Sequence, residues 1–313
     1  MTTPASTPLR LAARYLVGVD GGGSGTRLRL HQAADGRALA YTTSGPSGLG
    51  QGVEQAWRHI DHALQAAFDQ AGIGRAAPQE IALGLGLAGV EVPAQRAAFL
   101  AAAPDFACCV LHNDAQTTLR GAFGGCPGMV VTAGTGSIGL VQVPSGVQRR
   151  TGGWGFPVGD EGSGAWLGLR AMQAAQAALD GRGAVTPLAQ AVWRIAGADT
   201  ATLLQWCRDA GQHEYARLAP CVFEAAAAGD ASAETLLRAA AAELERIVQA
   251  LASHVDSAAS PLPIVLVGSI GERLQSRWPA ALQQRCVRPQ GDSAHGALAL
   301  LQEHLQRNGA GAR

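Results

Sequence analysis

Two glycine-rich loops, each placed between two strand-like runs, constrain this chain more than any other feature. The first, Asp20–Thr26, follows the apolar run Tyr15–Val19 and precedes the alternating run Arg27–Leu30. The second, Ala133–Ser137, follows Met129–Thr132 and precedes another run with β-branched residues. Glycine lets backbone N–H groups approach a phosphate closely, and Ser and Thr hydroxyls add donors. Two such hairpins predict an enzyme that grips a nucleotide triphosphate such as ATP.

The pattern of strand, loop, strand, turn and strand occurs once in each half of the chain. In the first half the turn is Ala34–Gly36 and the last strand is Arg37–Thr42. In the second half the turn is Pro144–Gly146 and the last strand is Val147–Thr151. Glycine-rich hairpins are common and two can match by chance, but the agreement of all these parts favours a duplication. We therefore expect two related domains.

Composition describes a soluble globular protein. A chain of 313 residues has room for two domains or one large domain with an ample core, and 47% of its residues are hydrophobic while 15% are charged. The net charge is zero and the basic residues are scattered, which argues against nucleic acid as a partner. No apolar stretch is long enough to span a membrane. The segment Met1–Ala13 lacks the apolar core of a secretory signal, so we expect a floppy tail.

The usage of cysteine and lysine excludes several classes of protein. Six cysteines show neither CxxC pairs nor a disulfide framework, which favours reduced thiols in the cytoplasm over metal or disulfide roles. The chain contains no lysine. P-loop NTPases, protein kinases and Schiff-base enzymes all need one. Phosphate charge must therefore be handled by backbone N–H groups, hydroxyls and a divalent cation.

Hydrophobic periodicity predicts an α/β fold. The first 115 residues read as βββαβαβα, which suits a mixed sheet with helices on both faces. After the three opening strands we expect helices over Val53–Ala71, Pro93–Ala103 and Ala115–Phe123, and strands over Glu80–Leu87 and Ala107–Leu111.

The second half repeats the three strands and then becomes helical over Ala165–His254, where Ser232–His254 is one helix with Ser232 as its N-cap. A buried strand over Pro263–Val267, a helix from near Glu272, a short strand over Cys286–Arg288 and a helix over Ser293–Gln306 follow. We expect domains over 14–118 and 119–292, with helix 293–306 packing back on the first.

Two aspartates end strands of the same predicted sheet. Asp20 can hold Mg²⁺, usually through water, facing the phosphates; the alternative is an Asx-turn that starts the loop. Asp114 can accept the proton of an attacking alcohol, an effect of about 10²–10⁴-fold; the alternative, compatible with it, is a helix N-cap. Ligands bind at the carboxyl ends of such strands. The neighbours His112 and Asn113 are weaker candidates and are expected to be structural.

Two further segments suggest ligand contacts. The loop Gly152–Ser163 carries an indole, Trp154, and two acids, a combination that holds sugars through ring stacking and hydroxyl contacts. The alternative is a structural loop with a buried Trp and a helix cap. Gly268–Gly271 follows a buried strand and would let an adenine ring lie on bare backbone, although such turns are common.

Together these motifs resemble the sugar-kinase, actin-like and chaperone ATPase superfamily, and within it the N-acetylglucosamine kinase and BadF/BadG/BcrA/BcrD ATPase family. The resemblance covers roughly Tyr15–Leu305, and the GGWG…GDEGS pattern of Gly152–Ser163 is its most specific part. It implies two ribonuclease-H-like domains around a central nucleotide cleft. It also implies an ATP- and Mg²⁺-dependent kinase that phosphorylates N-acetylglucosamine or glucosamine at the 6-hydroxyl, in the cytoplasm, with a homodimer left open.

The resemblance and the residues together give a set of site predictions. Asp114 is the expected catalytic base and Asp20 the expected metal ligand. Expected ATP contacts are Gly22, Gly23, Ser24, Gly25, Thr26, Gly134, Gly136, Ser137, Gly268 and Ser269. Expected sugar contacts are Asp114, Thr135, Gly152, Gly153, Trp154 and Asp160.

One position departs from the family pattern. Relatives usually carry a sugar-binding asparagine in the loop that matches Ser44–Leu49, where this chain has Gly48, a residue that could mark a positive φ. Glucosamine or a related amino sugar therefore stays open.

Two other classes are weighed against the kinase. The family also includes ATPases that activate CoA-ester dehydratases or reductases through an iron–sulfur cluster, but these cysteines lack cluster-like spacing. A sugar sensor without catalysis is disfavoured because both acids are present.

Overall fold

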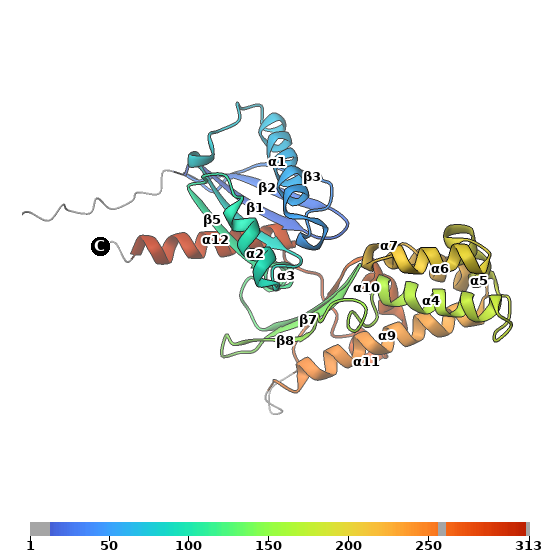
Figure 1. Cartoon of the computed structure of the whole chain (residues 1–313). Helices are drawn as coiled ribbons and strands as arrows, with labels where there is room; N and C mark the ends of the chain where they lie inside the picture. Colours follow the sequence, from blue (N-terminus) through green and yellow to red (C-terminus); the bar gives the residue numbers. More distant parts are fainter. Residues whose placement is uncertain (1–12, 256–260, 311–313) are drawn as a thin grey trace, which may run out of the picture. The chain divides into compact units, whose positions relative to one another are not determined.

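The chain divides into two units in the computed structural model, which describes residues 13–255 and 261–310 (Figure 1). The first unit holds the described residues up to Gly125 and those from Pro289 onward, and the second spans Cys126–Arg288. The expected division at 118/119 would fall inside one continuous helix, Asp114–Phe123. The expected tail over Met1–Ala13 lies outside the described residues except for Ala13. Among the described helices, none combines the length and apolarity that a membrane crossing requires.

The first unit is built on a five-stranded sheet in the order β3-β2-β1-β4-β5. β1, β2 and β3 are antiparallel neighbours, whereas β4 and β5 run parallel to β1, so the carboxyl ends of β1, β4 and β5 lie at one edge. Its elements are β1 (Tyr15–Gly21), β2 (Thr26–Gln32), β3 (Ala38–Ser44), η1 (Leu49–Gln51), α1 (Val53–Gln70), η2 (Pro78–Glu80), β4 (Ile81–Leu87), α2 (Pro93–Ala101), β5 (Cys108–Asn113), α3 (Asp114–Phe123) and α12 (Ser293–Ala310).

Helices cover both faces of this sheet (Figure 1). α1 packs on β2 and β3, and α12 packs on β1 and β4 and against α3. Glycines on the strands let α12 approach, since a Cβ at Gly18 would lie 2.2 Å from the carbonyl oxygen of Ala294. A Cβ at Gly84 would lie 2.5 Å from that of Ala297. The last helix thus covers one face of the sheet that carries the candidate acids.

The second unit repeats the arrangement with a four-stranded sheet in the order β8-β7-β6-β9. β6, β7 and β8 are antiparallel neighbours and β9 runs parallel to β6. The short strand expected over Cys286–Arg288 is reduced to a single bridge between Ile264 and Cys286. Because both units start with the same antiparallel meander and parallel fourth strand, the predicted α/β fold with two related domains is confirmed.

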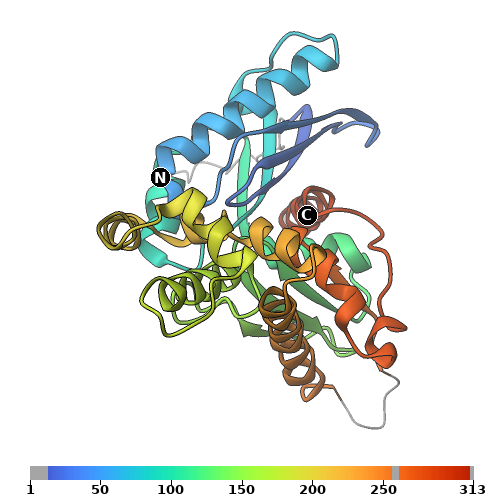
Figure 2. The same cartoon turned by 90° about the vertical axis from the view of Figure 1, so that its right-hand side faces the viewer.

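Helices fill the rest of the second unit, as the sequence predicted (Figure 2). α9 packs on β6, β7 and β8, and α4 packs against α5, α7, α8 and α9. The elements are β6 (Gly128–Ala133), β7 (Ser137–Gln142), β8 (Gln148–Gly152), α4 (Gly164–Leu179), α5 (Pro187–Ala196), α6 (Thr200–Asp209), α7 (Gln212–Ala216), α8 (Ala219–Ala227), α9 (Ala231–Ala252), β9 (Ile264–Val267), α10 (Ser269–Leu274), η3 (Gln275–Arg277) and α11 (Ala280–Gln283).

The long helix α9 is capped by Asp230, not by Ser232 as expected. Asp230 Oδ1 accepts hydrogen bonds from the backbone N–H groups of Ser232 at 2.9 Å and Ala233 at 3.1 Å. Its Oδ2 accepts from the N–H of Leu188, at the start of α5, at 2.9 Å. Burial raises the pKa of Asp230, but the hydrogen bonds outweigh it and hold the pKa at about 2. One carboxylate therefore joins the starts of two helices.

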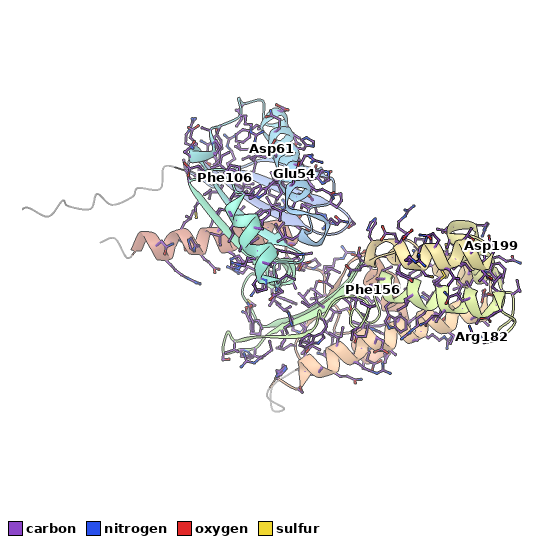
Figure 3. The ribbon with its side chains drawn as sticks, in the orientation of Figure 1. Glu54, Asp61, Phe106, Phe156, Arg182 and Asp199 are labelled. Atoms are coloured by element: carbon purple, nitrogen blue, oxygen red, sulfur yellow. The ribbon has the colours of Figure 1, made fainter. Side chains whose placement is uncertain are left out.

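We expect Asp230→Ala to lower the free energy of unfolding by about 2–4 kcal/mol, because it removes an N-cap and leaves the buried Leu188 N–H unpaired. The control is Asp199→Ala, which removes the exposed N-cap of α6 (labelled in Figure 3) and should cost about 0.5–2 kcal/mol. Urea unfolding measures both losses, and equal losses would contradict the double role of Asp230.

The same carboxylate makes a pH prediction. Its pKa of about 2 in the folded protein lies below the ordinary value of about 3.9 in the unfolded chain. Its contribution is therefore complete above about pH 4 and is lost as the pH falls toward 2. The stability difference between wild type and Asp230→Ala should shrink over that interval.

Candidate active site

The first glycine loop is held by its carbonyl groups. The carbonyl oxygen of Gly22 accepts from the N–H of Gly48 at 3.1 Å, and that of Gly23 accepts from the Gln51 side-chain amide at 3.1 Å. In a trans peptide the N–H points away from the preceding carbonyl oxygen. The N–H groups of Gly23 and Ser24 are thus turned away from this supporting segment and have no hydrogen-bond partner among the described residues. Such a row of free donors suits an anion.

The second glycine loop is held in the same way. The carbonyl oxygens of Gly134 and Thr135 accept from the N–H groups of Gly164 at 2.8 Å and Ala165 at 3.1 Å, at the start of α4. The N–H groups of Thr135 and Gly136 are therefore turned away from α4, and neither has a partner within the described part of the chain. Both predicted loops present free backbone donors for the same geometric reason.

The hydroxyl groups of the two loops differ in their accessibility. Thr26 is buried, and its hydroxyl lies 2.6 Å from the carbonyl oxygen of Gly45. Ser137 is also buried, and its hydroxyl donates to the carbonyl oxygen of Glu161 at 2.7 Å. Ser24 is exposed. The Thr26 and Ser137 hydroxyls are thus taken up inside the protein, which leaves the backbone donors and Ser24 to face a ligand.

The two predicted acids lie at one edge of the first sheet. Asp20 is the second-to-last residue of β1 and Asp114 directly follows β5, and both strands run parallel to β4 between them. Asn113 caps α3, since its Oδ1 accepts from the N–H of Gln116 at 2.8 Å, so the cap role weighed for Asp114 belongs to its neighbour. Burial, and secondarily the charge of Asp20, raises the pKa of Asp114 to about 6. Such a carboxylate is ionised at pH 7 yet basic enough to accept a proton.

Asp20 has a partner that the sequence analysis missed. Arg27 faces it across the β1–β2 hairpin and donates to its carboxylate at 3.1 Å. Burial raises the pKa of Asp20, while Arg27 and the Ser293 hydroxyl lower it. The Arg27 side chain is 58% exposed, so the ion pair contributes little to stability. The two residues flank the glycine loop symmetrically in the sequence, and this symmetry could have indicated their pairing.

The donor set at this edge fits Mg²⁺ only together with a substrate. The described residues contain no group of three or more His, Cys, Asp or Glu side chains that could hold a metal. Mg²⁺ keeps several waters and is usually bound by one or two carboxylates plus substrate phosphates. A partly buried Asp20 beside a phosphate-type loop matches that pattern.

A third carboxylate, Glu91, also escaped the sequence analysis. It follows β4 at the same edge, and its Oε1 accepts from the Asn113 side-chain amide. Its charge contributes to the raised pKa of Asp114. Glu91 follows β4, the middle of the three parallel strands, and this position in the sequence could have predicted its place at the edge.

The loop Gly152–Ser163 is hydrogen-bonded to the second hairpin at Ser137. The Ser137 N–H donates to Asp160 Oδ1 at 3.1 Å, and the Ser137 carbonyl oxygen accepts from the N–H of Gly153 at 3.1 Å. Gly153 has φ +70°, and a Cβ there would lie 2.7 Å from the Ile138 side chain, so only glycine fits. Three of the predicted sugar contacts, Gly152, Gly153 and Asp160, therefore lie next to the second glycine loop.

The aromatic residues of this loop point in different directions. Phe156 (Figure 3) packs on Tyr215, with ring centroids 5.2 Å apart. Trp154 is 77% exposed, and the Arg150 guanidinium lies 5.3 Å from its ring centroid. The alternative of a buried structural Trp is therefore wrong. An exposed indole face can stack on the C–H groups of a sugar ring.

Gly268 lies beside the second glycine loop. Its φ is +93°, and a Cβ there would lie 2.3 Å from the carbonyl oxygen of Ala133. The following helix α10 begins at Ser269, which is exposed, and not near Glu272 as expected. The bare backbone expected at Gly268 is present, and a tight approach to β6 requires it.

Comparison with known proteins agrees with these features. The BadF/BadG/BcrA/BcrD ATPase family matches residues 17–299. The glucosamine kinase GspK of Vibrio cholerae is 36% identical over 91% of this chain and 94% of its own length. The N-acetylmuramic acid/N-acetylglucosamine kinase of Clostridium acetobutylicum is 30% identical over 56% of this chain and 58% of its own.

Solved structures give the same result. A "putative N-acetylglucosamine kinase" from Chromobacterium violaceum is 47% identical, with a TM-score of 0.86 over 93% of this chain and 99% of that one. The activator of 2-hydroxyisocaproyl-CoA dehydratase from Clostridium difficile is 11% identical, with a TM-score of 0.52 over 95% and 96% of the two chains, and so shares the fold alone. The family that the motifs predicted is confirmed: the chain belongs to the BadF/BadG/BcrA/BcrD ATPase family.

Proposed function

We propose that this protein transfers the γ-phosphoryl group of ATP to the 6-hydroxyl of an amino sugar, glucosamine or N-acetylglucosamine. The observation that carries the proposal is the set of residues at the edge of the first sheet where the parallel strands end. There Asp114, free of the capping role and with a raised pKa, shares the strand ends with Asp20 and a glycine loop.

The class of enzyme follows from its relatives. The sequence predicted an ATP-dependent sugar kinase, and full-length similarity to a glucosamine kinase within an ATPase family confirms it. Because named relatives act on both glucosamine and N-acetylglucosamine, the preferred sugar and the hydroxyl that is phosphorylated belong to the proposal. The proposal also includes a cytoplasmic location, which the free state of all six cysteines supports.

The proposed contacts follow the geometry of each unit. Free backbone donors of the two glycine loops bind the phosphates, and the bare backbone at Gly268 and Ser269 carries the adenosine. Trp154 stacks on the sugar, and Asp160 accepts from a sugar hydroxyl. The proposed contacts are Gly22, Gly23, Ser24, Gly25, Gly134, Gly136, Gly268 and Ser269 for ATP, and Asp114, Thr135, Gly152, Gly153, Trp154 and Asp160 for the sugar. Thr26 and Ser137, which the sequence also predicted to contact ATP, are buried with their hydroxyls bonded inside the protein and are left out of the set.

In the proposed reaction, Asp114 orients the attacking hydroxyl and takes up its proton as the new P–O bond forms and the bond to ADP breaks. Asp114 then releases the proton to solvent. Mg²⁺, when bound with ATP, would offset the negative charge of the phosphates. Asp20 would hold it, and the free N–H groups of Gly23 and Ser24 would bind phosphate oxygens.

Wild-type protein should phosphorylate glucosamine or N-acetylglucosamine faster than glucose in an ADP-release assay, and NMR of the product should place the phosphate on C6. Asp114→Asn should lower kcat by about 10²–10⁴-fold, since an amide cannot accept the proton. Its sugar affinity, measured by calorimetry, should stay near wild type. A variant with near-wild-type kcat would show that Asp114 is not the base.

Asp20→Asn should raise the half-saturating Mg²⁺ concentration about tenfold or more, because one metal-facing carboxylate is lost. The matched control is Arg27→Gln, which breaks the same ion pair but leaves the carboxylate. Mg²⁺ titrations of kcat measure both variants. If both shift the Mg²⁺ requirement equally, Asp20 serves only as the partner of Arg27.

Gly48→Ala should raise the KM for ATP a few-fold. Gly48 has φ −63°, so the expectation of a positive φ was wrong, and any residue fits the backbone there. A Cβ at Gly48 would instead lie 3.2 Å from the carbonyl carbon of Gly22 and push on the first glycine loop. Gly50→Ala is the control, since nothing lies within 4 Å of a Cβ there. An unchanged KM for ATP would contradict this prediction and show that the first glycine loop can shift to accommodate the Cβ without loss of ATP affinity.

A further inference from the structure

A side chain from the helical region holds the carboxylate of Asp160. Gln212, the first residue of α7, donates its side-chain amide to Asp160 Oδ2 at 2.6 Å. The other oxygen, Oδ1, accepts from the N–H of Ser137 at 3.1 Å. Asp160 is only 4% exposed. Its carboxylate thus accepts hydrogen bonds on both oxygens, one from the second glycine hairpin and one from a helix about fifty residues further along the chain.

The backbone of Asp160 needs this support. Its φ is +62°, and within the described residues it is the one non-glycine residue with a positive φ. Such a conformation costs a side-chain-bearing residue about 1–2 kcal/mol and persists only where the surroundings hold it. A Cβ at Gly136 would lie 2.7 Å from Asp160 Oδ1, so the carboxylate rests directly on the second glycine loop.

The helix that carries Gln212 is itself well fixed. Tyr215, also in α7, packs between Phe156 of the loop Gly152–Ser163 (Figure 3) and Trp206 of α6, with centroid distances of 5.2 and 5.0 Å. Glu214 accepts from the N–H of Gly211 at 2.9 Å and closes the start of the helix. The Gln212 amide is therefore presented to Asp160 from a short but anchored helix.

We propose that Gln212 is a positioning residue that aims the carboxylate of Asp160 at the sugar and so sets sugar affinity. The inference rests on the proposed function, in which Asp160 accepts from a sugar hydroxyl. A carboxylate has about four lone-pair sites. Donors from Ser137 and Gln212 occupy one site on each oxygen, and the remaining lone pairs are available to a ligand.

The charges around Asp160 make this contact sensitive to substitution. Burial raises the pKa of Asp160, and the hydrogen bonds from Ser137, Gln212 and Phe156 lower it. The neighbouring Glu161 raises it further. The contacts from β7 and α7 are neutral donors. Gln212→Glu would therefore place a second carboxylate against the first, and the two would repel unless they shared a proton.

The test compares Gln212→Ala and Gln212→Glu with Gln205→Glu, a matched control. Gln205 makes the same amide–carboxylate hydrogen bond, to Asp209 at 2.7 Å, but both side chains are exposed. We measure kcat and the KM for glucosamine and N-acetylglucosamine at saturating ATP from pH 5.5 to 8.5. Gln212→Ala should raise the sugar KM about tenfold with kcat within about twofold, since hydrogen bonds to charged groups are the stronger ones.

Gln212→Glu is nearly isosteric and tests charge alone. Its loss in kcat/KM for the sugar should be largest at pH 8.5 and shrink as the pH falls, whereas Gln205→Glu should follow the wild-type profile. A sugar KM and pH profile like those of wild type in both Gln212 variants would overturn the proposal.

Amide exchange separates this inference from the proposed function. In ligand-free protein, the Ser137 amide should exchange faster in Gln212→Ala than in wild type or Gln205→Ala, because Asp160 is its acceptor. Unchanged exchange would overturn the positioning role whatever the substrate. Wild-type protein that phosphorylates no sugar would overturn the proposed function, while the exchange result would still decide whether Gln212 holds Asp160.

Discussion

The hydrogen bonds that hold the carbonyl groups of each glycine loop are the interaction on which the candidate phosphate loop of each unit depends. A glycine loop has no side chains to fix its peptide planes, so the hydrogen bonds to the carbonyls of Gly22 and Gly134 determine which way the N–H groups face. In one unit the donors come from the segment after β3, and in the other from the start of α4. The same result is thus reached with different partners, which gives each loop its own link to the neighbouring segment.

Those hydrogen bonds join segments that lie far apart in the sequence. Gly48 supports the first loop, and the loop Gly152–Ser163 is hydrogen-bonded to Ser137 in the second. In each unit the glycine loop and the segment that supports it are therefore joined by backbone hydrogen bonds. The absence of lysine agrees with this arrangement. Neutral N–H groups and a divalent cation would offset the negative charge of the phosphates, which P-loop NTPases and protein kinases contact with a lysine.

Much of the fold and some of the site could be predicted because their signals are local. Alternating runs, glycine loops and turns are read within a few residues, and they located both hairpins, the two acids at the sheet edge and the glycine-rich loop Gly152–Ser163. Other features were missed: Asp230 rather than Ser232 caps α9, and its carboxylate also accepts from the N–H of Leu188. The pairing of Asp20 with Arg27 across the hairpin was missed although the two residues flank the loop symmetrically. No periodicity points from Gln212 to Asp160, which a loop and several helices separate.

The sequence by itself determined the α/β class, the duplicated hairpins and the family, because glycine, proline and hydrophobic spacing act on the chain locally. The tertiary structure alone decided which polar groups are free. It buried the hydroxyls of Thr26 and Ser137, left Trp154 exposed and transferred the capping of α3 to Asn113. A hydrogen-bonding group is available to a ligand only if no neighbour satisfies it, and those neighbours are assembled by packing rather than by adjacency along the chain.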